Sequence, residues 1–148
     1  MRQELPMFLI RVIVGLVFLL EGALKFAFPS AYGESFFTSI GLPFAHILAP
    51  AVGGIEIAGG LAVLFNFYAG DAALALILVL VTALITTKLP VLLGHPIGPL
   101  PLPKVTMYGW LSFLHEARVE LCLLFGSIAV LVDSGLRVGR RRHWYQGN

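Results

Sequence analysis

Four apolar runs constrain the fold of this chain more than any other feature of its sequence. They cover residues 6–28, 45–67, 72–93 and 110–132. Each run is about 20 residues long, the length that an α-helix needs to cross a hydrocarbon core about 30 Å thick. The pattern therefore predicts an all-α fold, specifically an integral membrane four-helix transmembrane bundle.

The composition also indicates a membrane protein. Of the 148 residues, 58% are hydrophobic and 12% are charged, whereas soluble domains are about 45–50% apolar and about 25% charged. We predict one transmembrane domain, residues 1–136, followed by a basic tail, residues 137–148. The first run is too long for a signal peptide and contains Glu21 and Lys25, so we expect it to remain as a membrane span.

The distribution of basic residues predicts an orientation in the membrane. The tail contains Arg137, Arg140, Arg141 and Arg142, whereas the two long connections between runs contain one basic residue, Lys104. The positive-inside rule then places both termini in the cytoplasm and both long connections outside, in a bacterial-type cytoplasmic (inner) membrane. Each long connection is either a surface loop or a segment that covers a site.

Eight ionisable side chains inside the runs are the candidate functional residues. A charge at the bilayer centre costs at least about 2.5–3.5 kcal/mol, and four cations balance four anions here, so we expect them to pair with one another. Two interpretations stay open: ion pairs that only fix helix packing, or a polar cavity for a head group, a quinone or a proton path. The set comprises Arg11, Glu21, Lys25, Glu56, Lys88, Glu116, Arg118 and Glu120.

Helical periodicity predicts which of these side chains share a face. In the first run, Arg11 and Lys25 lie on one stripe, and in the second run Glu56 lies among glycines. Small residues allow close helix approach in lipid, so we expect the two stripes to face each other, with Arg11 on Glu56. The predicted packing glycines are Gly15, Gly22, Gly53, Gly59 and Gly60.

The fourth run places charges on two opposite faces. Glu116 and Glu120 share a face, whereas Arg118 points away from both. We expect Arg118 to face another helix of the bundle, another subunit or the outer head groups. The run therefore serves two interfaces.

Several chemistries lack their usual signatures. The single cysteine, Cys122, excludes intrachain dithiol chemistry and is expected to be a small core residue. The sequence contains no HExxH, P-loop or GxGxxG motif, and we predict no metal site. His46, His95 and His115 match no ligand spacing, so haem is not expected, and no cofactor other than a quinone is indicated.

Three segments together resemble the DoxX family of small four-span membrane proteins. They are RVIVGLVFLLEGALKF (residues 11–26), GLP (41–43) and GGIEIAGGLAVLF (53–65). The resemblance implies a four-helix transmembrane bundle, a place in membrane redox assemblies and a link, in related proteins, to thiosulfate oxidation with quinone. The residues that carry the family pattern are Arg11, Gly15, Gly22, Lys25, Glu56, Gly59 and Gly60.

Two functional hypotheses follow from the residues and the resemblance. The first is a redox-associated membrane protein that binds quinone or a small reductant through the charged cluster, with electrons passing to a partner or to the quinone itself. The second is a non-catalytic accessory subunit that packs in the membrane against a larger complex. Further membrane subunits or copies of the chain in a homo-oligomer are expected partners beside the lipid bilayer, and the net charge of +2 gives no reason to expect nucleic acid. Solute transport ranks below both, because four spans without an internal repeat make a minimal transporter.

Overall fold

The computed structural model describes residues 4–146, and the side chains of residues 5–135. The predicted basic tail, residues 137–148, lies outside the part whose side chains are described. Within the described residues the chain is helical and forms no strand. The elements are α1 (Glu4–Ala27), α2 (Glu34–Ser39), α3 (Ala45–Leu64), α4 (Ala69–Ala83), the π-helix η1 (Leu84–Lys88), α5 (Leu89–Leu93), α6 (Trp110–Glu116) and α7 (Arg118–Gln146).

Three of the described helical segments are long and apolar enough to cross a membrane. They are Leu5–Ala27, Ala45–Leu64 and Ala69–Leu93, and they match the first three predicted runs closely. The fourth predicted run, residues 110–132, is not one continuous helix, because the chain breaks at Ala117 between α6 and α7. Three helices thus have the length and the composition of membrane spans.

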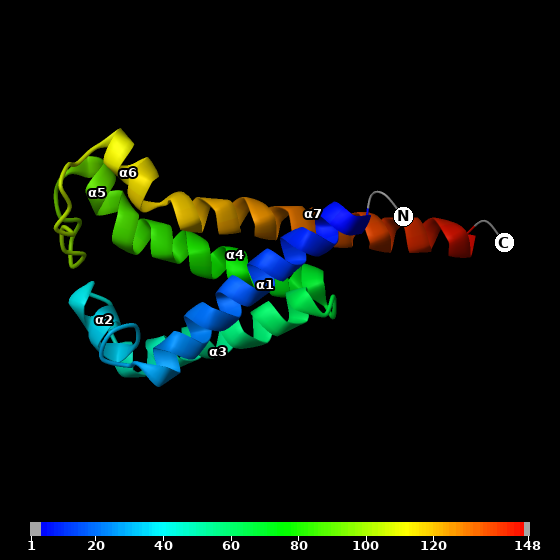
Figure 1. The fold of residues 1–148 in the computed structure, drawn as a ribbon, viewed down its shortest axis with the longest axis horizontal. Coiled ribbons are helices and arrows are strands. Elements are labelled where there is room, and N and C mark those ends of the chain that lie inside the picture. The colour runs from blue at the N-terminus through cyan, green and yellow to red at the C-terminus, as the bar shows by residue number, and fades with distance from the viewer. Residues whose placement is uncertain (1–3, 147–148) are drawn as a thin grey trace.

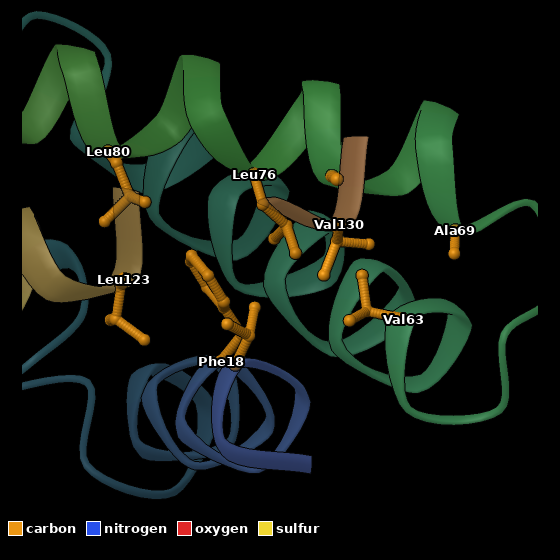
Figure 2. Close-up of a cluster of buried hydrophobic side chains, with 9 residues drawn as sticks. Phe18, Val63, Ala69, Leu76, Leu80, Leu123 and Val130 are labelled. Atoms are coloured by element: carbon orange, nitrogen blue, oxygen red, sulfur yellow. The ribbon is translucent and has the colours of Figure 1, made fainter. Parts of the chain in front are cut away.

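The long helical segments pack around a main hydrophobic core, and Phe37, Ala45 and Ala49 form a second, smaller cluster. α1 contacts α3 and α7, and α4 contacts α3 and α7. Phe18 of α1 points toward Leu76 and Leu80 of α4 and Leu123 of α7 (Figure 2). Small residues on α4, such as Ala73, let it approach the core closely, because they add little side-chain volume.

The two long connections lie at the same end of the molecule. Figure 1 shows α2 and residues 94–109 at one end of the bundle, with the start of α1 and the end of α7 at the other. The two connections also touch each other there: a Cβ added at Gly41 would lie 2.0 Å from the carbonyl oxygen of Pro99. Gly41 has φ +79, so this position combines close contact with a backbone conformation that favours glycine.

The π-helix η1 has a local cause in the sequence. Pro90 has no backbone N–H and cannot donate to the carbonyl one turn earlier, which disturbs the regular ladder. The hydroxyls of Thr86 and Thr87 instead donate to carbonyl oxygens of the preceding turn, at 2.8 and 2.7 Å. Such π segments are rare and frequently occur at functional sites, and this one ends at Lys88.

Candidate functional site

The glycine stripes of α1 and α3 face each other, as the periodicity predicts. A Cβ added at Gly15 would lie 2.8 Å from the carbonyl oxygen of Gly60. One added at Gly22 would lie 2.7 Å from the carbonyl oxygen of Gly53. Any side chain at these positions would push the two backbones apart, so the glycines fix the distance and the register between α1 and α3.

Gly59 faces a different helix from the one predicted. A Cβ at this position would lie 2.9 Å from Leu76 Cδ2 of α4. Adjacent residues on a helix differ by about 100° in direction, so Gly59 and its neighbour Gly60 contact different partners. The GG pair therefore allows close approach of both α4 and α1 to α3.

Glu56 pairs with Lys25, and the predicted pair of Arg11 with Glu56 is wrong. Lys25 Nζ lies 2.7 Å from Glu56 Oε2, and the two side chains are only 10% and 6% exposed. Lys25 Nζ also donates to the carbonyl oxygen of Glu21 at 3.3 Å. α1 and α3 run in opposite directions, so the contact of Gly15 with Gly60 places Arg11 beyond the reach of Glu56.

Arg11 instead pairs with an aspartate that the sequence analysis missed. Arg11 Nη2 donates to Asp133 Oδ2 at 2.5 Å, which joins α1 to α7. Asp133 lies one residue beyond the predicted end of the fourth run, so it was not counted among the intramembrane charges. Arg11 lies near the start of the first run and Asp133 near the end of the fourth, so both are expected at the same end of the bundle. This shared level is the sequence feature that could have predicted the pair.

A third ion pair lies in the wall of a recess. Lys88 Nζ of η1 lies 3.2 Å from Glu120 Oε1 of α7. The recess has a volume of about 230 Å³, and Glu116 also lines it. The shared face of Glu116 and Glu120 is therefore confirmed. The remaining walls come from α2 and the residue after it, η1, α5 and the second long connection, through Phe36, Ile40, Thr87, Val91, Pro103 and Val105.

Arg118 lies apart from this recess. Its side chain is exposed, and Nη1 donates to the carbonyl oxygen of His115, next to the break between α6 and α7. Arg118 thus does not line the recess that Glu116 and Glu120 share. The predicted outer cluster divides into one pair between α1 and α3 and another between η1 and α7.

An apolar groove of about 300 Å³ adjoins the charged recess. It runs between α2, α3 and α4, where Phe37, Val52 and Leu78 contribute to its lining. Phe36 of α2 and Ile40, the residue directly after α2, line both the groove and the recess. The two spaces are therefore neighbours at these residues, and the charged side chains lie on the recess side.

No group of three or more His, Cys, Asp and Glu side chains that could hold a metal ion occurs among the described residues. Cys122 is exposed on α7, contrary to the predicted role as a core residue. A cysteine facing the lipid side is compatible with its weakly polar side chain.

Comparison with known proteins identifies related sequences. The sequence profile of the DoxX family matches residues 7–89. The uncharacterized membrane protein Rv3486 of Mycobacterium tuberculosis is 38% identical over 122 residues, which cover 82% of this chain and 71% of Rv3486. CatD of Bacillus subtilis, provisionally named an oxidoreductase, is 36% identical over 86 residues, which cover 58% of this chain and 62% of CatD, less than two thirds of that protein. No solved structure matches the chain at comparable significance.

Proposed function

Because the chain belongs to the DoxX family of membrane proteins, we propose that it is a redox-associated protein that binds the head group of a quinone. The proposed site is the recess between η1, α6 and α7. The provisional name of CatD, an oxidoreductase, supports a redox role. The chain itself would bind the quinone, and a partner protein would exchange electrons with it.

The observation that carries this proposal is the junction of the recess with the apolar groove. A quinone has a polar ring and a hydrocarbon tail, so it needs a polar space and an apolar space that are continuous. Phe36 and Ile40 line both the recess and the groove, so the two spaces are neighbours there. Ligand pockets commonly combine a mostly apolar lining with a few convergent polar groups.

Lys88 is the residue expected to recognise the ring. Its ammonium group has three N–H donors, and its ion pair with Glu120, at 3.2 Å, is not a short one. One donor can therefore turn to a ring oxygen while another stays with the carboxylate. The rare π-helical turn that ends at Lys88 supports a functional role for this side chain.

A titration with a short-tailed quinone tests the proposal. The full chain in lipid nanodiscs is titrated with decylubiquinone, and Lys88→Gln is compared with Lys104→Gln, an exposed lysine in the second long connection. A hydrogen bond to a charged group contributes about 1.5–3 kcal/mol, so Lys88→Gln should weaken binding by roughly tenfold or more, and Lys104→Gln should not. The double variant Lys88→Gln with Glu120→Gln removes both members of this ion pair and serves as a second site variant. Equal affinities in all four proteins would overturn the proposal.

We also propose four membrane crossings, with both termini in the cytoplasm of a bacterial inner membrane. α6 and α7 together would supply the fourth crossing. The location of α2 and residues 94–109 at one end of the bundle, opposite the start of α1, supports this topology (Figure 1). An impermeant maleimide should label Lys104→Cys in a Cys122→Ala background in intact spheroplasts, and labelling only after lysis would reverse the orientation.

Arg118 supports the alternative function, an accessory subunit of a larger complex. It is an exposed cation that does not line the recess. A carboxylate of a partner helix could pair with it, because one hydrogen bond to the His115 carbonyl leaves further guanidinium donors free. This alternative places function at an interface, whereas the quinone proposal places it in the recess.

A further inference from the structure

Hydrogen-bond acceptors outnumber donors among the side chains of the recess. Its polar side chains are Thr87, Lys88, Glu116 and Glu120. The Thr87 hydroxyl already donates to the carbonyl oxygen of Ala83 at 2.7 Å, so it has only lone pairs to offer. Lys88 is thus the single side-chain donor facing two carboxylates and a hydroxyl oxygen.

Glu116 is the group that lacks a partner. Lys88 is shared with Glu120, and the structure gives Glu116 no hydrogen bond or ion pair among the described residues. Glu116 is partly buried at the recess wall. A carboxylate needs a donor once water is displaced from it, so a ligand that fills the recess and displaces water from Glu116 has to supply one.

The net charge of the recess also favours a neutral ligand that donates hydrogen bonds. With all three groups ionised, one cation and two anions give the recess a charge of −1. A small anionic reductant would meet like charge in a partly buried space, where repulsion is less screened than at the surface. A neutral ligand that donates hydrogen bonds meets no such penalty.

The oxidised and reduced forms of a quinone differ in whether the ring can donate hydrogen bonds. The oxidised ring presents two carbonyl oxygens, which only accept. The reduced ring presents two hydroxyls, each of which can donate and accept. Hydrogen bonds from a hydroxyl to a carboxylate are short and strong. An oxidised ring beside Glu116 would instead place the lone pairs of a carbonyl oxygen against those of the carboxylate, with no hydrogen between them to form a bond.

We propose that the recess prefers the reduced, hydroxyl-bearing form of the ring, with Glu116 accepting a hydrogen bond from one hydroxyl and Lys88 donating to an oxygen of the ring. This inference rests on the proposed function and adds the form of the ligand that the site selects. Glu116 acts here as a specificity-determining residue in binding.

The test compares three ligands that share one tail. They are decylubiquinol, kept reduced under anaerobic conditions, decylubiquinone, and the dimethyl ether of decylubiquinol, whose ring oxygens cannot donate. The full chain in nanodiscs should bind the quinol roughly tenfold or more tighter than either of the others. Equal affinity for quinol and quinone, or for quinol and its ether, overturns the inference but leaves the proposed function standing. Failure of all three to bind overturns the proposed function itself.

A substitution at Glu116 sharpens the test. In Glu116→Gln the side chain gains an N–H₂ donor, so quinone binding should tighten while quinol binding weakens. Misfolding cannot produce the tighter binding, so the opposite changes separate recognition from stability. Glu34→Gln, at an exposed glutamate on α2, is the matched control and should leave both affinities unchanged. A preference that is the same in Glu116→Gln and wild type, or stronger binding of decylammonium than of the quinol, overturns the inference.

Discussion

Lys88 Nζ lies 3.2 Å from Glu120 Oε1, and this pair joins the π-helical turn of the third membrane helix to α7. The pair is partly exposed, at 19% and 24% of its side chains, because it borders a recess. A second ion pair, Lys25 with Glu56, is enclosed between α1 and α3. This difference in surroundings separates the pair at the proposed binding site from a pair enclosed between two helices.

We predict that Lys25 and Glu56 have a structural role. Lys25→Met leaves a buried carboxylate without its partner, which should lower the free energy of unfolding by about 3–5 kcal/mol. The double variant Lys25→Met with Glu56→Leu removes both charges and should recover much of that loss. Thermal unfolding in detergent measures the change. A Lys25→Met protein as stable as wild type would show that the pair is not scaffolding.

The contact between α1 and α3 should tolerate no side chain at Gly15. Gly15→Ala places a Cβ 2.8 Å from the Gly60 carbonyl oxygen, and such overpacking typically costs about 1–3 kcal/mol. Gly54→Ala, in the same helix pair but with nothing within 4 Å of the added Cβ, is the matched control. We expect a melting temperature several degrees lower for Gly15→Ala, about 4–8 °C per kcal/mol for a small domain and less for a larger one. Equal melting temperatures for the two variants would contradict the close packing.

The accessory-subunit alternative predicts a partner that depends on Arg118. Arg118→Leu should release a protein that otherwise co-purifies in stoichiometric amount, because the replacement removes the exposed cation without altering the recess. Mass spectrometry of gently purified complexes measures this loss. Arg118→Lys keeps the charge and should retain the partner. Unchanged recovery with Arg118→Leu would remove this face from consideration.

The sequence predicted which faces of α1 and α3 pack together, but not the level along the neighbouring helix at which each charged side chain finds its partner. The glycine stripes of α1 and α3 were predictable because only residues without a side chain let two backbones touch. The partner of Glu56 was not, since helical angle fixes the direction of a side chain but not its level along a neighbouring helix. The register set by Gly15 and Gly60 brought Lys25 to Glu56 and left Arg11 for Asp133.

Helical periodicity could not predict the recess, for a different reason. Glu116 and Glu120 were predicted to share a face, and they do. The walls opposite them come from α2 and from Pro103 and Val105 in the proline-rich connection. Neither segment has a strong helical pattern, and their positions depend on contacts between the two connections, such as Gly41 with Pro99.

The most direct test of a quinone site in the recess is the quinone content of the protein purified from native membranes. Mass spectrometry of extracted lipids gives the amount of quinone per chain for wild type, for the double variant Lys88→Gln with Glu120→Gln, and for Lys104→Gln. We predict close to one quinone per chain in wild type and Lys104→Gln, and a large loss in the double variant at unchanged thermal stability. Absence of quinone from wild type, or equal amounts in all three proteins, would contradict the account.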